Sequence, residues 1–330
     1  MKFRTEVDIP ELKSKLNYRH QSMMIGSCFA ENIGNYLEAL CFPISVNPFG
    51  ILYNPISIAN SLFHILNGKV FSEKDLFFAN NLYNSFSHHS CFSDVKSESV
   101  LNKINIQLTN ALKDLQNSSH LFITFGTAWV FRHKISGEVV SNCHKLPANN
   151  FEKERLTVRQ ITEIWSPLIT RIHKLNCGLK FVFTVSPIRH LKDGAHDNQL
   201  SKSALLLAID QLISEFGEDN VSYFPAYEVV LDELRDYRFY ASDMTHPSEM
   251  ATQFIREKFS ETMLGDEARV ISKEISKLVL ALNQKLLNNN RKEYFSFIES
   301  QIEKAIYVQN KYPFVDLNRL NKKLLEKRQD

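Results

Sequence analysis

Short apolar runs alternate along the chain with longer stretches in which hydrophobic residues recur at the spacing of an α-helix. The apolar runs have the length of strands and lack polar alternation, which predicts strands buried on both faces. They cover residues 22–25, 42–46, 120–125, 180–185 and 221–224. The stretches with helical periodicity predict amphipathic helices. They cover residues 30–40, 55–67, 97–116, 157–175, 201–216, 226–235 and 247–259.

Buried strands that alternate with amphipathic helices are typical of an α/β fold with a mainly parallel sheet. The runs above predict about five strands, and helices on both faces would complete a three-layer α/β/α sandwich. A small hairpin is expected over residues 129–141, with its turn at the Ser136-Gly137 pair.

The pattern changes after Gly265, where helical stretches follow one another without strands between them. They cover residues 268–287, 293–308 and 315–325. We therefore expect an α/β domain over residues 1–265 and a helical C-terminal extension over residues 266–330. The extension holds 13 Lys and Arg against 9 Asp and Glu, a modest excess that is typical of a solvated helix face.

Composition argues against several classes of protein. A net charge of +2 over 330 residues gives no strong attraction to nucleic acid or to an anionic membrane. No apolar stretch approaches the ~18 residues of a membrane helix, and the first residues are charged, unlike a signal peptide. The five cysteines show neither a disulfide framework nor paired zinc-ligand spacing. We expect a cytoplasmic protein that binds neither nucleic acid nor membrane.

Four of the predicted strands end in polar or glycine-containing loops. These loops are Gly26-Ser27, residues 47–50, Gly126-Thr127 and Ser186-Pro187. The carboxyl ends of parallel strands share one edge of a sheet, and ligands of open α/β sheets bind in the crevice beyond that edge. We therefore expect the binding site where these loops gather.

Ser27 is the candidate nucleophile. Gly26 lets the chain turn sharply off its strand, and the following helix directs free N–H groups at the serine hydroxyl. Such a turn can present a nucleophile and stabilise the oxyanion that its attack creates. Ser27 also suits the ordinary N-cap of that helix, so a purely structural role stays open.

Asp243 and His246 lie three residues apart in the turn before the helix that Pro247 begins. At this spacing a carboxylate can accept from one imidazole nitrogen while the other nitrogen faces a hydroxyl. The aspartate would fix the tautomer and stabilise the imidazolium that forms when the histidine takes the serine proton. Alternatively, both side chains cap backbone groups, but the Gly-Ser turn in the same parallel sheet favours the catalytic interpretation.

Gly26-Ser27-Cys28-Phe29-Ala30 is the signature that names the GSCFA family, and five further segments resemble its other blocks. They are NPFGILYNP (47–55), GTAWV (126–130), NCHKLP (142–147), VSPIRH (185–190) and DMTHP (243–247). The resemblance spans about residues 20–260 and leaves out the C-terminal extension. The family is similar to the SGNH/GDSL hydrolases, which have a three-layer α/β/α fold. The resemblance implies hydrolysis of acyl esters without a metal or organic cofactor.

Matching the motifs of the family to this chain implies that Ser27 is the nucleophile and that Asp243 and His246 are its partners. It implies that the backbone N–H groups of Ser27 and Gly50 contribute to the oxyanion hole. Where the superfamily has Gly-x-Asn-Asp, this chain has Gly126-Thr127-Ala128-Trp129, so an alanine replaces the oxyanion asparagine. Asn142 is a candidate substitute donor.

We assign substrate binding to residues that follow the strands or lie in the matching blocks. They are Gly126, Thr127, His144, Arg189 and His190. A guanidinium directly after a strand would favour an anionic or sugar-like group on the substrate.

Two other chemistries are weaker alternatives. Cys28 lies at a helix start, where the pKa of a thiol falls, but neighbouring side chains on a turn diverge, which favours Ser27 as the nucleophile. Five histidines in loops could gather round a metal, yet no pair has a recognised zinc-ligand spacing. They are His88, His89, His144, His190 and His196, the last with Asp197 beside it.

The sequence therefore predicts a metal-independent serine hydrolase of acyl esters. Its expected substrate is a small molecule or carbohydrate, for example an O-acetylated sugar. An acyltransferase on the same scaffold and a ligand-binding module that retains these residues as capping groups are the alternatives.

Overall fold

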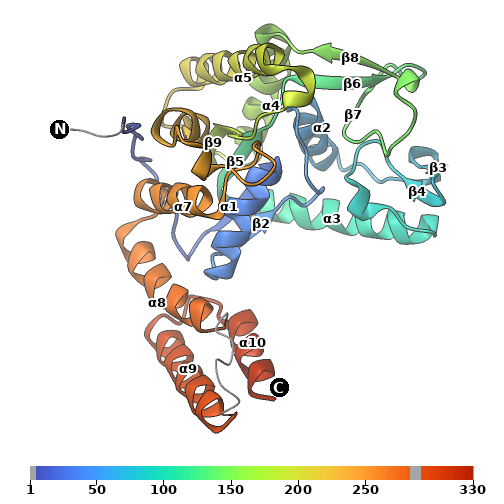
Figure 1. Ribbon diagram of the computed structural model, residues 1–330. Coiled ribbons are helices and arrows are strands. Elements are labelled where there is room, and N and C mark those ends of the chain that lie inside the picture. The colour runs from blue at the N-terminus through green and yellow to red at the C-terminus, as the bar shows by residue number, and fades with distance from the viewer. Residues whose placement is uncertain (1–4, 283–290, 330) are drawn as a thin grey trace.

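A five-stranded sheet forms the centre of the molecule (Figure 1). The computed structural model describes residues 5–282 and 291–329. The strand order is β10-β9-β5-β1-β2, and every neighbouring pair runs parallel. The strands are β1 (Gln21–Gly26), β2 (Ile44–Val46), β5 (Ser118–Phe125), β9 (Lys180–Val185) and β10 (Val221–Tyr223). The predicted α/β fold with a parallel sheet is confirmed.

Helices cover both faces of the sheet. Successive residues of a strand point to opposite faces, so each strand contributes to two separate cores. Met23 and Ile25 of β1 pack into one core, whereas Met24 packs into the other. The first core takes in α2 (Pro55–Leu66), α3 (Ser97–Asn117), α4 (Val158–Leu175) and α5 (Ala195–Phe216). The second takes in α1 (Cys28–Ala39), α6 (Ala226–Glu228) and α7 (Glu249–Met263). The expected three layers are present.

Capping residues set several helix boundaries. Oδ1 of Asn54 accepts from the Ser57 N–H at 2.8 Å, and Pro55 occupies the first turn of α2. Thr157 and Gln160 form a reciprocal capping box at the start of α4. These short polar signals explain why the predicted starts of α2 and α4 lie close to the observed ones, whereas α5 begins six residues before its predicted start at 201.

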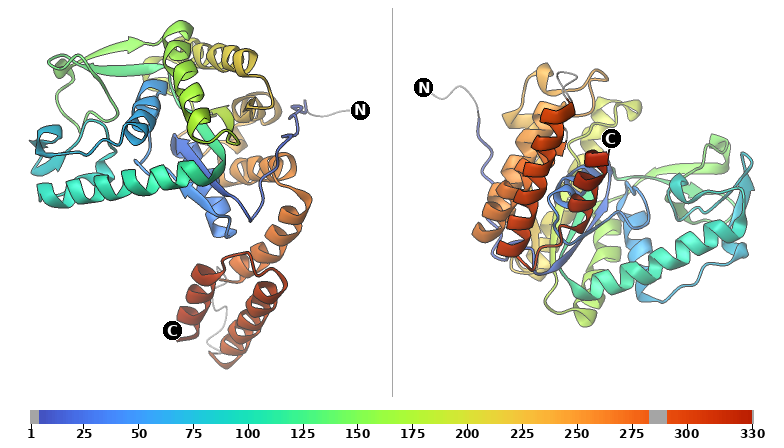
Figure 2. Two further views of the ribbon diagram at one scale, coloured as in Figure 1. Left: turned by 180° about the vertical axis from the view of Figure 1, so that it is seen from behind. Right: turned by 90° about the horizontal axis from the view of Figure 1, so that it is seen from below.

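Three helices extend away from the sheet at the C-terminal end of the chain (Figures 1 and 2). They are α8 (Asp266–Leu282), α9 (Arg291–Lys311) and α10 (Asn318–Gln329). Ile275, Ala305 and Leu320 are buried with the second core, so apolar packing continues from the sheet into these helices. The expected helical region is present, and the last residues of the predicted 268–287 helix lie outside the described residues.

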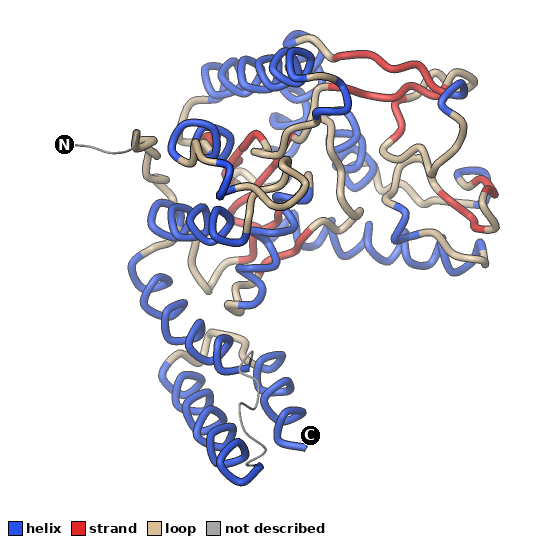
Figure 3. Tube along the Cα trace, viewed as in Figure 1, coloured by secondary structure: helices blue, strands red, loops and turns tan. Residues whose placement is uncertain are grey.

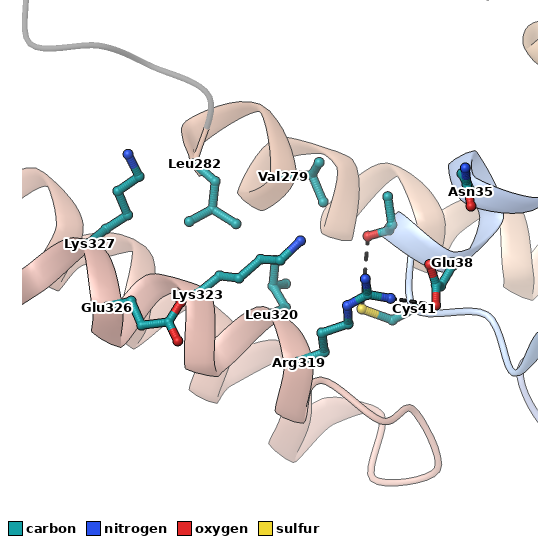
Figure 4. A pocket seen from close by; sticks show the side chains of 11 residues that line it. Asn35, Glu38, Cys41, Val279, Leu282, Arg319, Leu320, Lys323, Glu326 and Lys327 are labelled. Carbon is teal, nitrogen blue, oxygen red and sulfur yellow. Dashed lines mark hydrogen bonds and ion pairs between the residues drawn. The ribbon is translucent and has the colours of Figure 1, made fainter. Parts of the chain in front are cut away.

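A pocket of about 570 Å³ lies where the C-terminal end of α1 meets α8 and α10 (Figure 4). Arg319 of α10 forms an ion pair with Glu38 of α1, and Lys323 also lines the pocket. Because Ser27 caps the other end of α1, this pocket is separated from the candidate nucleophile by the length of that helix.

A lobe of short antiparallel strands lies on the opposite side of the sheet from the C-terminal helices (Figures 1 and 3). The predicted hairpin is present as β6 (Trp129–His133) and β7 (Val139–Val140). The sequence missed β8 (Phe151–Arg155), which pairs with the other edge of β6, and the hairpin of β3 (Phe77–Ala79) and β4 (Leu82–Asn84). Strand β8 has one apolar residue in five, and β3 and β4 are three residues each, too short to show a strand pattern.

The predicted 226–235 helix differs from the structure. Only Ala226–Glu228 is α-helical, and a π-helix follows over Val229–Glu233. The wider turn, closed by the Leu234 N–H on the Val229 carbonyl at 3.0 Å, buries Val229, Val230 and Leu234 together in the second core. Short 3-10 helices cover Glu73–Asp75, Ser90–Phe92, Ala148–Asn150, Leu191–Asp193 and Tyr237–Phe239.

Within residues 5–282 and 291–329, no helix combines the length and the apolar character needed to cross a bilayer.

Candidate active site

The strand order changes direction between β1 and β5. Strand β2 lies on one side of β1, and β5, β9 and β10 follow in order on the other side. In open α/β sheets the ligand crevice lies beyond the carboxyl ends of the strands at such a point. Ser27 follows β1 and Gly126 follows β5, and a Cβ placed on Gly126 would lie 3.4 Å from the Cβ of Ser27. The fold therefore brings these two residues into contact in the crevice.

Backbone hydrogen bonds join the other loops to this contact. The Gly126 N–H donates to the Tyr53 carbonyl at 2.7 Å, which ties the β5 loop to the loop after β2. The Ser186 N–H donates to the Phe125 carbonyl at 2.8 Å, which ties in the loop after β9. The four loops picked out in the sequence thus gather at one edge of the sheet.

Ser27 is the N-cap of α1 and is only 1% exposed. Its Oγ accepts from the Phe29 N–H at 3.3 Å, so the capping interpretation is confirmed. A cap uses the hydroxyl only as an acceptor, and its own hydrogen stays available to a base. The capping role and the nucleophilic role are therefore compatible.

Asp243 and His246 form the expected carboxylate–imidazole pair. Oδ2 of Asp243 lies 2.5 Å from Nδ1 of His246, and Oδ1 accepts the N–H groups of Thr245 and His246 at 2.9 Å each. The backbone N–H groups of His246 and Thr245, followed by the imidazole, hold the pKa of Asp243 well below its usual range. Because a carboxylate only accepts, Nδ1 carries the hydrogen and Nε2 is left as the basic nitrogen.

The turn that carries this pair is closed on itself. The Ala241 N–H donates to the His246 carbonyl, and the Ser248 N–H donates to the Phe239 carbonyl, both at 2.8 Å. Ser248 then caps α7. The side chains of His246 and Asp243 stay 52% and 50% exposed, so the pair lies on the rim of the crevice, open to solvent.

Helices α1 and α7 run parallel beside each other. Arg256 donates to Oδ1 of Asn32 at 3.0 Å, and the hydroxyls of Tyr36 and Ser260 lie 3.2 Å apart. Both pairs join residues 224 positions apart, so the two helices point the same way and begin at the same edge of the sheet. The turn that precedes α7 therefore shares this edge with the N-cap of α1.

Ser27 and His246 share this edge without touching. Among the residues that the structure describes, no hydrogen bond joins Ser27 to His246. His190, in the loop after β9, packs edge-on against Tyr53 of the loop after β2, with the ring centroids 6.3 Å apart. Burial, and next the charge of Lys202, lower the pKa of His190 to about 4, so this ring is neutral at pH 7.

Lys202 of α5 is a buried cation that the sequence analysis missed. It is 1% exposed, and its Nζ donates to the carbonyls of Gly126 and Ser186 at 2.7 Å each. Burial lowers its pKa to about 7. Lys202 thereby links the loops after β5 and β9 directly beneath the crevice. The sequence does indicate the burial of Lys202, because this residue lies three positions before Leu205, on the apolar stripe of the helix.

The first turns of α5 hold the same loops through two further buried side chains. Oγ of Ser201 accepts from the Ala128 N–H at 2.8 Å and lies 3.1 Å from Oγ1 of Thr127. Oδ1 of Asn198 accepts from the His190 N–H at 3.0 Å. Thr127, expected to bind substrate, thus uses its hydroxyl within the protein.

The buried position of Lys202 makes stability depend on pH. Its pKa is about 7 in the folded protein against an ordinary 10.5, so folding disfavours the ammonium form. The contribution of Lys202 to stability therefore falls as pH drops from about 10.5 to about 7 and is constant below that. Lys202→Met removes this dependence. Between pH 7 and pH 10.5, the free energy of unfolding of the wild type should therefore rise by about 3–5 kcal/mol more than that of the variant. Urea denaturation from pH 6.5 to 9 covers about half of that change, and parallel curves for the two proteins would contradict it.

The model of the GSCFA family matches residues 21–259. This chain belongs to the GSCFA family. A comparison with curated proteins found no match. The matched segment begins at β1 and ends within α7, so it contains Ser27, Lys202, the Asp243–His246 pair and all five strands.

Two expected oxyanion donors of this GSCFA protein have other partners. The Ser27 N–H donates to the Thr124 carbonyl at 3.2 Å, which continues the β1–β5 ladder. The Gly50 N–H donates to the Asn47 carbonyl at 2.8 Å and closes a turn. The structure therefore does not leave these two N–H groups free for an oxyanion.

Asn142 and His144 lie in the antiparallel lobe. Oδ1 of Asn142 accepts from the His144 N–H at 2.8 Å, which makes a local turn. Nε2 of His144 lies 2.9 Å from the Ser85 carbonyl, and its ring packs edge-on against Phe77. The turn serves the packing of the lobe, so the expected oxyanion role of Asn142 and substrate role of His144 have no support in this geometry.

Two further side chains at the crevice of this GSCFA protein compare differently with the sequence-based expectations. Nε of Arg189 is buried without a hydrogen-bond partner among the described residues, which suits a group that receives a ligand. Burial raises the pKa of the Cys28 thiol, opposite to the fall expected at a helix start, so the thiolate is disfavoured. No group of three or more His, Cys, Asp and Glu side chains converges within the described ranges.

Proposed function

We propose that this GSCFA protein is a serine hydrolase that cleaves acyl esters of a small molecule or carbohydrate. The observation that carries the proposal is the Asp243–His246 pair, at the same sheet edge as Ser27 and with Nε2 of His246 left basic. A hydroxyl, an oriented imidazole and a carboxylate are the three groups that acyl transfer through serine requires. The resemblance of the family to SGNH/GDSL hydrolases supports the same chemistry without a cofactor.

In the proposed mechanism His246 takes the proton of Ser27 as Oγ attacks the ester carbonyl. The tetrahedral intermediate collapses, His246 protonates the leaving alkoxide, and the alcohol departs. Water, deprotonated by His246, then attacks the acyl-serine, and the carboxylic acid leaves as Ser27 regains its proton. Asp243 stays ionised throughout and stabilises the imidazolium. The step requires Nε2 to come within about 2.6–3.2 Å of Oγ, an approach that often tightens only when substrate binds.

The residues around the crevice support an ester with a polar or anionic alcohol part. Arg189 has a buried guanidinium nitrogen with no acceptor in the described part of the chain, and neutral His190 faces the ring of Tyr53. A guanidinium and an aromatic ring are suited to a carboxylate, a phosphate or a sugar.

Acyl transfer to a second alcohol is the alternative that one observation favours. Ser27 is almost fully covered, and an acyl-serine shielded from water persists until another acceptor arrives. Hydrolysis and transfer share the first half of the mechanism and differ only in the acceptor.

Turnover of short nitrophenyl esters and of acetylated sugars, with and without an added alcohol, tests the proposal. The expected result is ester cleavage by the wild type that is abolished in Ser27→Ala, while a new ester with the added alcohol would identify a transferase. Equal turnover by the folded Ser27→Ala variant would contradict the proposal. Binding of these esters without any turnover would identify a ligand-binding module.

The five cysteines are all unpaired, which supports placing this activity in a reducing compartment such as the cytoplasm.

A further inference from the structure

The oxyanion donors of this protein remain to be assigned, because Ala128 replaces the superfamily asparagine and the N–H groups of Ser27 and Gly50 are engaged elsewhere. An ester carbonyl attacked by Ser27 needs donors beside the nucleophile for the charge that develops on its oxygen. Two groups next to Ser27 have donors without acceptors among residues 5–282 and 291–329.

The first is the side-chain amide of Asn47, which begins the loop after β2 and is only 8% exposed. Its Oδ1 accepts from the Gly26 N–H at 2.8 Å. Because Gly26 offers a donor, the oxygen must face it, and this fixes the orientation of the amide. Nδ2 is then buried without a hydrogen-bond partner within the described part of the chain. A buried donor left unpaired destabilises a fold, which indicates that another molecule supplies the acceptor.

The second is the backbone N–H of Cys28, the first residue of α1. The first N–H groups of a helix have no acceptor within the helix, and no oxygen of the described residues accepts this one. The positive end of the helix dipole adds to its pull on an anion. In another fold of serine hydrolases, the N–H of the residue after the nucleophile serves in the same way.

These two donors flank the nucleophile. Cys28 follows Ser27 in the chain, and Asn47 is hydrogen-bonded to Gly26, the residue that precedes it. We propose that Nδ2 of Asn47 and the N–H of Cys28 form the oxyanion hole of this enzyme. The inference rests on the proposed esterase function and assigns Asn47 as a catalytic residue that contacts the substrate oxygen.

Asn47→Asp tests the side-chain donor. Its carboxylate keeps an acceptor for the Gly26 N–H and the size of the side chain, but it places an acceptor where the oxyanion needs a donor. The expected result is a fall in kcat of at least about 10²–10³-fold with little change in KM. Asn81→Asp is the matched control, since both Asn47 (φ 43°) and Asn81 (φ 61°) have a left-handed backbone but Asn81 lies in the turn between β3 and β4. Equal kcat in the folded Asn47→Asp and Asn81→Asp variants would overturn the assignment.

Cys28→Pro tests the backbone donor. Proline suits the first position of a helix, and Ser27 already has the extended backbone (φ −68°, ψ 176°) that a following proline requires. The substitution therefore removes one N–H from an intact helix. Relative to Cys28→Ala, which retains that N–H, we expect a kcat about 10²-fold or more lower. A ratio near one would remove Cys28 from the oxyanion hole.

A measurement on the unmodified protein keeps the proposal testable if these variants do not fold. Phenylboronic acid forms a tetrahedral adduct with a reactive serine and places an oxygen in the oxyanion hole. In protein labelled with ¹⁵N-asparagine, a side-chain NH₂ proton should move downfield on adding the boronate, and it should be assignable to Asn47. An adduct that leaves the Asn47 signal unmoved would refute the oxyanion role. Absence of any adduct or turnover in the wild type would instead refute the esterase function itself.

Discussion

His246→Ala is expected to lower the turnover of acyl esters by about 10²–10⁴-fold. The imidazole is the only group of the proposed machinery that takes the Ser27 proton and returns it to the leaving alkoxide, so both halves of the reaction lose their base and acid. The fold should be unaffected, because His246 is half exposed and its backbone bonds to Asp243 and Ala241 do not depend on the ring. Steady-state hydrolysis of a nitrophenyl ester gives the ratio directly.

His196→Ala is the matched control for this prediction. His196 is an exposed histidine in the first turn of α5, so its loss should leave turnover unchanged. Free imidazole added to His246→Ala should restore part of the activity by replacing the missing base. Turnover in His246→Ala equal to the wild type would exclude the proton-transfer role.

Asp243→Asn is expected to lower kcat by about 10³–10⁴-fold while the protein stays folded. Asparagine keeps an oxygen for the N–H groups of Thr245 and His246, so the turn before α7 is preserved. Its NH₂ group, however, faces Nδ1 of His246 where the carboxylate accepted a hydrogen. The imidazole must then hold its hydrogen on Nε2, which leaves no base toward Ser27.

The same substitution separates catalysis from folding. Because the Asp243 carboxylate is ionised and exposed, its role in the turn is carried by hydrogen bonds that asparagine reproduces on one side. The thermal unfolding midpoint should therefore change little while kcat falls. A Tm lowered in step with the activity would assign Asp243 to the structure of the turn and remove it from the chemistry.

The layered fold could be predicted because the hydrophobic pattern is strong at every strand of the central sheet. The runs at 120–125 and 180–185 are apolar on both sides, and only a sheet covered by helices on both faces buries them. That architecture alone placed the loops after β1, β2, β5 and β9 at one edge. The candidate pair Asp243–His246 could be predicted as well, because a separation of three positions within one turn brings the two side chains together.

The support beneath the site could not be predicted in the same way. Lys202 looks like a surface lysine unless its helical phase is compared with that of Leu205. In the sequence Asn47 looks like an ordinary turn residue. Only the structure shows that its Oδ1 accepts from the Gly26 N–H and that its Nδ2 has no acceptor among the described residues. Asn142 is a reasonable candidate by residue type, but its side chain caps His144, which Asn80, Ser85 and Phe77 hold within the lobe.

The central claim is that the hydroxyl of Ser27 is a reactive nucleophile. A fluorophosphonate transfers its phosphonyl group to such a hydroxyl and releases fluoride, and mass spectrometry of the digested protein locates the adduct. The account predicts one phosphonyl group on Ser27 of the wild type, with labelling slowed in His246→Ala and absent from Ser27→Ala. An unlabelled Ser27 in folded protein that turns over esters, or an adduct that persists in Ser27→Ala, would contradict it.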